Sequence, residues 1–488
     1  MADYWIRFGV FLLVGFLVSA CRAEDFPSSL SLADPAIQPS TPLSGEGEIA
    51  VTPATPTAAT VPPTYAILGT PTLAPTTTPL PTSFFSEDLS PPCGLILPSL
   101  PRAPSETQSI LTPDTISLER LRETMPVVAR PALQRLIDAP ESVGLAIYQV
   151  GRENEGVIWN ADSPMPLASV AKLIVLVAYV EAVANGELDP LAAVTLVELE
   201  QYYLPNFDLG AHRRAVQELR EGGRVFSEEG AAPYVLLEDV AWMMVRHSSN
   251  AASDYLHHLL GQSRIEETAL ALGLDQASGQ TAPCTFLGQF LVMANHTRAA
   301  ANDRASLESY LQDEAGAEVY GRDVALLFDA YREQASFRQS EVTWRSEVRR
   351  PTIETQRFFA GRLAPQGTAR AYGELMARLA QNGLSNADSS YQARRYLEWP
   401  MRFPVNQESF SNLGYKNGSL PGVLTTAYYG YRLGESAPVV IAMFYRDLPQ
   451  QTYRRWRFDL PHDELARWLL ADPEALPLLA AALNQATP

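Results

Sequence analysis

Ser169 and Lys172 are the first pair of residues whose types and spacing could do chemistry. They stand in the stretch PLASVAKLIVLVAYVEAV, where a long apolar run follows the lysine at once. Residues three positions apart lie on one face of a helix, so the lysine amine can reach the serine hydroxyl. A desolvated amine at the start of a helix can take the proton from that hydroxyl and make it a nucleophile. The alternative is an N-cap serine followed by a surface lysine, which the apolar run disfavours.

Ser248 and Asn250 form a second candidate pair, in the stretch VAWMMVRHSSNAASDYLHHLL between two predicted apolar helices. A hydroxyl and an amide two positions apart can face the same cleft. The hydroxyl could pass a proton to a leaving nitrogen, and the amide could hold a substrate carbonyl or the lysine. The alternative is an ordinary polar turn between helices.

The third candidate is the run Lys416, Asn417, Gly418 and Ser419, just before a predicted strand hairpin. A lysine on an edge strand supplies positive charge for a substrate carboxylate, and a glycine lets a ligand lie against the strand. On local grounds alone, a Lys-Asn-Gly-Ser hairpin turn is the better interpretation.

The order of these three motifs resembles that of the active-site serine β-lactamases and penicillin-binding proteins. Class A β-lactamases are similar in the flanking residues as well: the apolar run after Lys172, the small residues after Asn250, and GSLPGV after Lys416 and its neighbour. The resemblance covers roughly residues 110–488 and does not extend to the segment before them.

The resemblance implies that three side chains carry out catalysis. Ser169 would be the nucleophile that is acylated, Lys172 would be its general base, and Ser248 would relay the proton. The product of this step would be an acyl-enzyme.

The resemblance also implies five substrate-binding residues: Asn250, Lys416, Asn417, Gly418 and Ser419. Lys416 would bind the substrate carboxylate, and Asn250 would hold the substrate's amide side chain. The backbone N–H groups of the nucleophile and of Ser419 would form an oxyanion hole.

The sequence departs from the class A pattern at three places. Ser249 replaces an Asp that is mainly structural, and Asn417 replaces a Thr or Ser that helps to bind the carboxylate, which implies altered recognition. The chain has no clean copy of the Glu-x-x-Leu-Asn loop, whose Glu activates the water that releases the acyl group. The nearest match is Glu308 in ESYLQ, farther beyond Asn250 than the family spacing predicts. A surface Glu on a polar helix is the favoured alternative.

Acylation and deacylation are separable steps, so the missing Glu divides the functional hypotheses. The leading hypothesis is a serine hydrolase that hydrolyses β-lactams and so gives antibiotic resistance. The first alternative is a D-Ala-D-Ala carboxypeptidase, endopeptidase or penicillin-binding sensor with slow deacylation, acting on cell-wall peptide. The second, suggested by the same three departures, is a non-catalytic surface binding lipoprotein.

Residues 1–21 read MADYWIRFGVFLLVGFLVSAC and have the pattern of a secretion signal. The end of this segment resembles a lipoprotein processing box, which implies a lipid on Cys21 and an extracytoplasmic protein anchored to a bacterial membrane. The alternative is a membrane-spanning helix, but the apolar run is shorter than the roughly 20 residues that a span needs. Residues 22–104 are rich in Pro, Thr, Ser and Ala, which predicts a disordered tether.

Residues 105–488 form the predicted hydrolase domain. Four segments have the pattern of strands in two hairpins: Ser142–Val150 with Glu155–Asn160, and Leu424–Leu433 with Ala437–Tyr445. We expect a final helix around Asp463–Leu483 and mostly helices between the hairpins. The prediction is an α/β fold of the α+β sandwich type: an antiparallel sheet from both ends of the domain, packed with helices, plus an all-helical lobe.

Composition excludes several classes of function. The formal net charge of −18 excludes nucleic acid as the main partner, and the 46% of hydrophobic residues excludes global disorder. The six histidines form no ligand set, so we expect no metal and no cofactor. Cys93 and Cys284 could form a disulfide in an oxidising compartment, and two free thiols are equally compatible with the sequence. We expect a monomer.

Overall fold

The computed structural model describes residues 92–95, 113–274, 282–294, 304–347 and 351–483, all of them within one unit, Thr78–Pro488. The predicted signal segment with Cys21 lies outside the described residues, as does most of the predicted tether. Residues 92–95 are the exception, because Cys93 and Leu95 are buried. The prediction of a disordered tether is wrong for these four residues.

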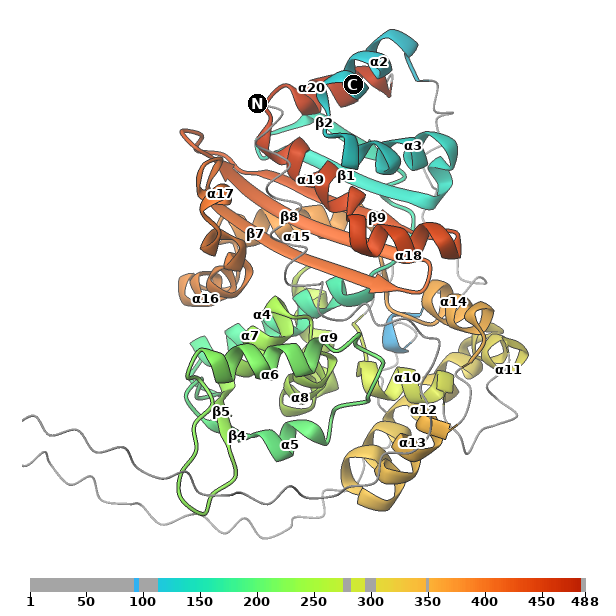
Figure 1. Ribbon diagram of the computed structural model, residues 1–488, viewed down its shortest axis with the longest axis vertical. Coiled ribbons are helices and arrows are strands. Elements are labelled where there is room, and N and C mark those ends of the chain that lie inside the picture. The colour runs from blue at the N-terminus through green and yellow to red at the C-terminus, as the bar shows by residue number, and fades with distance from the viewer. Residues whose placement is uncertain (1–91, 96–112, 275–281, 295–303, 348–350, 484–488) are drawn as a thin grey trace, which may run out of the picture. The chain divides into compact units, whose positions relative to one another are not determined.

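The main sheet is antiparallel and takes strands from both ends of the domain (Figure 1). Its order is β2–β1–β9–β8–β7, with bounds Arg152–Trp159, Val143–Gln149, Val439–Tyr445, Val423–Arg432 and Phe410–Leu420. β1 and β9 pair in register from Val143↔Tyr445 to Gln149↔Val439 and so join the two predicted hairpins into one sheet. The predicted fold class is confirmed.

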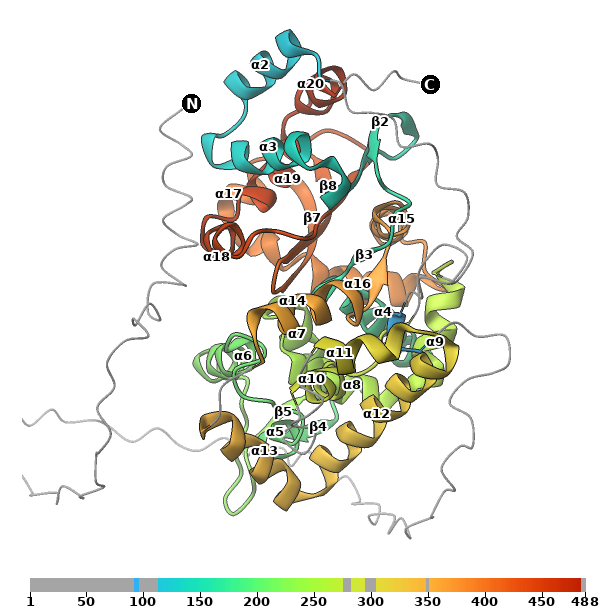
Figure 2. The ribbon, with the colours of Figure 1, turned by 90° about the vertical axis from the view of Figure 1, so that its right-hand side faces the viewer.

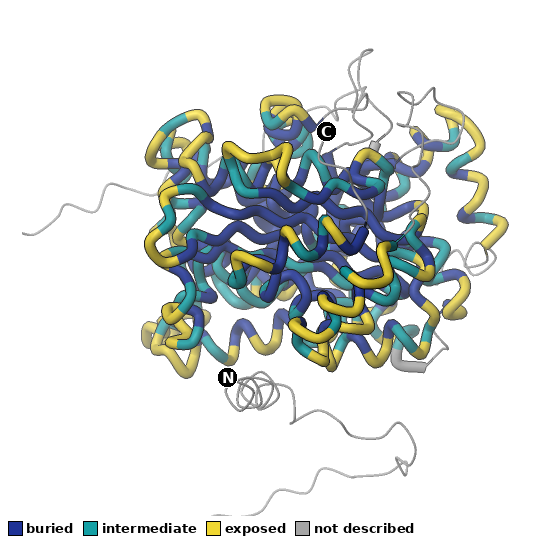
Figure 3. The backbone as a smooth tube through the Cα atoms, turned by 90° about the horizontal axis from the view of Figure 1, so that it is seen from above, coloured by how far each residue is buried: buried dark blue, intermediate teal, exposed yellow. Residues whose placement is uncertain are grey.

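Helices cover both faces of the central strands. On one face lie α2 (Thr115–Thr124), α3 (Arg130–Asp138), α18 (Gln450–Asp459), α19 (Pro461–Ala471) and α20 (Ala475–Ala482). On the other face, α15 (Ala369–Ala380) packs against β1, β8 and β9. Every residue of β9, VVIAMFY, is therefore buried, which explains why the strand reads as an unbroken apolar run. Figure 3 shows this buried centre in dark blue.

Strand β7 decides between the two interpretations of Lys416–Ser419: these residues are part of an edge strand and not of a hairpin turn. These residues lie inside a strand of 11 residues and pair with β8, for example Gly418 with Thr425. The turn that joins β7 and β8 comes later, where Gly422 has a φ of 82°. An Asn-Gly pair predicts a turn only when the flanking strands end beside it, and here the apolar pattern continues to Leu420.

The predicted final helix is two helices, α19 (Pro461–Ala471) and α20 (Ala475–Ala482). Asp472 has an extended backbone, with φ −95° and ψ 116°, and precedes Pro473. Proline disfavours the helical conformation of the residue before it, so the helix has to end there.

Between β2 and β7 the chain is mostly helical (Figures 1 and 2). Besides α15, the α-helices of this part are α4 (Lys172–Ala184), α5 (Leu196–Glu200), α6 (Ala211–Glu221), α7 (Leu237–Arg246), α8 (Asn250–Leu260), α9 (Gln262–Ala271), α10 (Phe286–Ala294), α11 (Arg304–Glu308), α12 (Glu314–Glu333), α13 (Ala335–Glu347), α14 (Ile353–Arg362), α16 (Ala387–Leu397) and α17 (Pro404–Gln407). This part also contains two short pairs of strands. Strand β3 (Met165–Pro166) pairs with β6 (Gln366–Gly367), and β4 (Ala193–Thr195) pairs with β5 (Tyr234–Leu236).

Helix α4 is the centre of the helical lobe and packs against α7, α8, α9 and α16. All residues from Lys172 to Val180 are buried, because the apolar run of the sequence faces neighbours on every side. Among the described residues, no helix is long and apolar enough to cross a membrane.

Candidate active site

Ser169 lies in a short 3₁₀ helix, Ala168–Ala171, that continues directly into α4. Ala168 has a φ of 48°, a conformation that residues other than glycine rarely adopt, and it turns the chain sharply before the serine. The Nζ atom of Lys172 donates to Ser169 Oγ at 3.2 Å. The predicted three-residue spacing therefore places amine and hydroxyl in contact.

Lys172 is the centre of a hydrogen-bonded cluster. Its amine donates to the backbone oxygen of Ser248 and to Oδ1 of Asn250, both at 2.7 Å, and lies 3.4 Å from Ser248 Oγ. Only 1% of the residue is exposed. The interpretation of Lys172 as a surface lysine is wrong, since its amine joins the first two motifs inside the protein.

Ser248 lies in the connection between α7 and α8 and has a φ of 63°. This left-handed conformation turns the chain so that both its carbonyl and its hydroxyl face the amines. The neighbouring Ser249 is the N-cap of α8, where its hydroxyl accepts from the backbone N–H of Ala252. Asn250 then begins the helix with its amide oxygen on Lys172.

Strand β7 brings the third motif to the same place. The Nζ atom of Lys416 donates to Ser248 Oγ at 3.0 Å and to the backbone oxygen of Asn417 at 2.8 Å. A Cβ atom at Gly418 would lie 2.6 Å from the backbone nitrogen of Ser169. The strand backbone therefore passes directly beside Ser169, which only a glycine permits.

Asn417 and Ser419 alternate with Lys416 and Gly418 along β7 and so point to the opposite face of the sheet. The hydroxyl of Ser419 is 2.9 Å from the phenol oxygen of Tyr453 in α18. The structure thus places the backbone oxygen of Asn417 on Lys416 and the hydroxyl of Ser419 on Tyr453.

Burial governs the charge of the two amines. It lowers the pKa of Lys172 to about 7, against the opposing effect of the Asp254 and Asp208 carboxylates. Burial also lowers the pKa of Lys416 well below its usual value, and the neighbouring Lys172 lowers it further. A neutral amine at Lys172 is therefore available near neutral pH, as a general base requires.

The amino-acid composition also points to these two lysines, independently of the spacing of the motifs. The chain has 37 basic residues, and only Lys172 and Lys416 are lysines. Arginine stays protonated at all accessible pH values, whereas a buried lysine can lose its proton. The only two basic side chains able to do so, apart from the histidines, are the two at this cluster.

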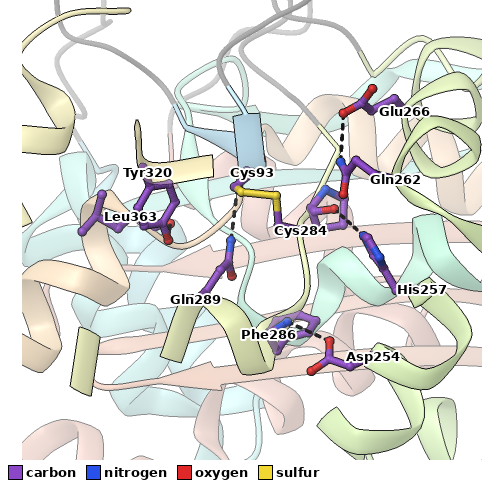
Figure 4. Close-up of a disulfide and its surroundings, with 11 residues drawn as sticks. Cys93, Asp254, His257, Gln262, Glu266, Cys284, Phe286, Gln289, Tyr320 and Leu363 are labelled. Carbon is purple, nitrogen blue, oxygen red and sulfur yellow. Dashed lines mark hydrogen bonds between the residues drawn. A yellow bond between two sulfur atoms is a disulfide. The ribbon is translucent and has the colours of Figure 1, made fainter. Parts of the chain in front are cut away.

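A disulfide fastens the segment that precedes α10. Cys93 and Cys284 are joined, and Gln289 of α10 donates to the backbone oxygen of Cys93 at 3.4 Å (Figure 4). Since Cys284 is two residues before the start of α10, the bond links the N-terminal segment to the part of the chain beside Lys172.

Asp254 and Phe286 complete this side of the site. Both carboxylate oxygens of Asp254, in α8, accept backbone N–H groups at the start of α10, from Phe286 and Leu287, at 2.7 Å each. Figure 4 shows the bond from Phe286. The ring centroid of Phe286 lies 4.8 Å from Lys172 Nζ. Sequence reasoning missed both residues, because nothing in their local spacing says that α10 begins next to the lysine.

The structure does not bring Glu308 into the cluster. It lies at the end of α11, with its side chain 46% exposed, and its carboxylate pairs with Arg304 one helical turn earlier at 2.6 Å. This is the surface glutamate of the alternative interpretation, so the structure gives no support to Glu308 as the deacylating base.

We expect the disulfide to contribute substantially to stability. Replacing both Cys93 and Cys284 by Ser should lower the free energy of unfolding by about 4 kcal/mol, because the bond closes a very long loop in the unfolded chain. Urea unfolding of the variant and of the wild-type protein measures the difference. Equal unfolding midpoints without reductant would contradict a formed disulfide.

Among the described residues, no group of three or more His, Cys, Asp or Glu side chains is placed to hold a metal ion.

Residues 129–454 match the model of a family described as "Beta-lactamase enzyme family". No curated protein sequence matches the chain significantly.

Similar solved structures include two β-lactamases and a protein named PBP-A. The β-lactamase from Sphaerobacter thermophilus is 14% identical over 73% of this chain and 98% of its own, with a TM-score of 0.40. That from Desulfarculus baarsii is 16% identical over 70% and 99%, with a TM-score of 0.39. PBP-A is 12% identical over 72% and 98%, with a TM-score of 0.38.

Proposed function

Because the chain belongs to the Beta-lactamase enzyme family, we propose that it is a serine hydrolase that β-lactams acylate at Ser169 and that releases the acyl group slowly. One observation carries the proposal: the buried amine of Lys172 contacts the Ser169 hydroxyl at 3.2 Å and has a pKa lowered to about 7. A hydroxyl in contact with a neutral amine is activated to attack a carbonyl.

In the proposed acylation, Ser169 Oγ forms a bond to the carbonyl carbon of the β-lactam while its proton passes to Lys172 Nζ. Backbone N–H groups of Ser169 and Ser419 stabilise the negative charge on the carbonyl oxygen. The C–N bond then breaks, and Ser248 passes a proton to the leaving nitrogen. Its hydroxyl is within reach of both Lys172 and Lys416, which can resupply that proton.

The pH dependence follows from the base. Because Lys172 acts only as the free amine, the acylation rate should rise with pH and reach half its maximum near pH 7, the pKa of Lys172. Rapid-mixing measurements of penicillin labelling across this range give the profile. A rate that stays constant from about pH 5 to pH 9 would contradict the assignment of Lys172 as the base.

The residues near Ser169 and Lys172 support slow release of the acyl group. Hydrolysis of the acyl ester requires a water molecule and a base that activates it. On the α10 side of Lys172 the contacting residue is the apolar Phe286. Asp254 uses both carboxylate oxygens on the start of α10, and in the described part of the chain no carboxylate is hydrogen-bonded to Ser169 or Lys172. These contacts favour a lasting acyl-enzyme over the β-lactam turnover of the leading sequence hypothesis.

The substrate class proposed is a cell-wall peptide that ends in D-Ala-D-Ala, with Lys416 binding its terminal carboxylate. A β-lactam would be captured as a mimic of that peptide. The N-terminal segment supports a place outside the cytoplasm: we propose export by residues 1–21, a lipid on Cys21 and a tether over most of residues 22–104. The domain would then act near a bacterial membrane as a monomer without a cofactor.

A time course tests the proposal. The protein is incubated with a fluorescent penicillin, excess reagent is removed, and the intact mass is followed over hours. We expect an adduct that persists. Rapid loss of the adduct with release of the opened product would instead establish β-lactam turnover. No adduct at any time would reject both enzymatic functions and favour a non-catalytic binding lipoprotein.

A further inference from the structure

A buried histidine lies next to the second motif. His212 of α6 is 1% exposed, and its Nδ1 atom is 3.1 Å from the hydroxyl oxygen of Ser249. Ser249 itself has no exposed surface. Two buried polar groups in contact hold each other firmly, because neither can turn to water instead.

The rest of the histidine ring is held as well. Its Nε2 atom is 3.5 Å from a carboxylate oxygen of Glu200 at the end of α5. The ring stacks on Tyr203, with centroids 4.8 Å apart. The pKa of Glu200 is lowered, chiefly by its hydrogen bond from His212. A proton on Nε2 satisfies every contact: Nε2 donates to Glu200, and Nδ1 accepts from Ser249.

Ser249 sits between the two residues that bind the lysine amine. Ser248 and Asn250, its neighbours, supply the two 2.7 Å bonds to Lys172. The connection also contains the left-handed backbone of Ser248, a conformation that persists only where surrounding contacts impose it. A shift of Ser249 would therefore move the acceptors of Lys172 and the proton relay together.

We propose that His212 is a positioning residue for acylation: through its hydrogen bond to the Ser249 hydroxyl it holds Ser248 and Asn250 in the geometry that orients Lys172. The inference rests on the proposed acylation of Ser169. No hydrogen bond joins His212 to Ser169 or Lys172 in the described part of the chain, and its proposed effect passes through the connection between α7 and α8.

Two substitutions distinguish the effect of the His212–Ser249 hydrogen bond from the effect of packing of the histidine ring. His212→Phe keeps an aromatic ring on Tyr203 but removes the acceptor for Ser249, and it should slow penicillin acylation about tenfold. His212→Asn keeps an acceptor near the position of Nδ1 while losing the ring, and its rate should stay within about threefold of wild type. A residue that only filled space would give the reverse order, with the Phe variant the better enzyme.

A third substitution tests the same bond from its other end. Ser249→Ala also removes the N-cap hydrogen bond to Ala252, so it should slow acylation at least as much as His212→Phe. The double variant should be no slower than Ser249→Ala alone, because that change already removes the hydrogen bond to His212. If His212→Phe fails to fold, Ser249→Ala still tests the contribution of this hydrogen bond to acylation. Asp313→Ala, which removes the N-cap of α12, and His462→Phe, which replaces a buried stacked histidine of α19, are the controls. Both should acylate at the wild-type rate.

The outcomes distinguish the two proposals. A wild-type protein that penicillin does not label would reject the proposed function itself. A labelled wild type with unchanged acylation rates in both His212→Phe and Ser249→Ala would leave acylation standing and overturn the role of His212. Equal losses in the Phe and Asn variants, or multiplied losses in the double variant, would also overturn it.

Discussion

Replacing Lys172 by Met is expected to slow acylation of Ser169 by about three orders of magnitude, since general-base catalysis typically contributes between 10²- and 10⁴-fold. Methionine is close to lysine in length and is apolar, so it fits the buried position. It cannot take the Ser169 proton, and it leaves the oxygens of Ser248 and Asn250 without their donor. Rates of labelling by a fluorescent penicillin measure the loss.

Lys172→Arg is the matched control for charge. Arginine keeps the positive charge and the donors, but it does not deprotonate at accessible pH, so its acylation rate should be as low as that of the Met variant. If the Arg variant kept the wild-type rate, the amine would act through its charge and not as a base. A wild-type rate in the Met variant would remove Lys172 from the mechanism.

Replacing Gly418 by Ala is expected to slow acylation about a hundredfold, because a displacement of about 1 Å at a reacting centre has effects of this size. The new Cβ atom would lie 2.5 Å from Thr425 Oγ1 and 2.6 Å from the backbone nitrogen of Ser169. Neither neighbour can move freely: Thr425 donates to the backbone oxygen of Leu167, two residues before the nucleophile. Ser169 and the proposed oxyanion hole must therefore shift together.

Gly361→Ala is the control for this change, since a Cβ atom at that position in α14 meets nothing within 4 Å. We expect it to leave the acylation rate unchanged and to raise stability slightly, as alanine favours a helix. If Gly418→Ala acylated as fast as wild type, the close approach of β7 to Ser169 would be irrelevant to catalysis.

The fold was predictable where a local sequence pattern is compatible with only one type of secondary structure. The apolar run after Lys172 predicted a buried helix, and the run Ala437–Tyr445 predicted a strand, because no other element buries such sequences. The stretch Lys416–Ser419 fits both a turn and a strand, and only pairing with β8 decides for the strand. The break in the final helix was readable from Asp472-Pro473, which the helical periodicity on either side obscured.

The site was predictable only as separate motifs. Motif order pointed to Ser169, Ser248 and Lys416, but their contacts depend on how segments 168 residues apart meet across the fold. The identity of the group beside Lys172 could not be predicted, since the start of α10 is placed by Asp254 and by the disulfide. The same holds for His212, whose only mark in the sequence is its residue type.

Peptide mapping of the penicillin adduct shows which residue of the chain is acylated. Trypsin should release residues 153–172 as one peptide that carries Ser169, because the preceding residue is Arg152 and the segment ends at Lys172. We predict that the added mass lies on Ser169 in this peptide and that the Ser169→Ala protein shows no adduct. An adduct on any other residue, or labelling of the Ser169→Ala protein at the wild-type rate, would contradict the account.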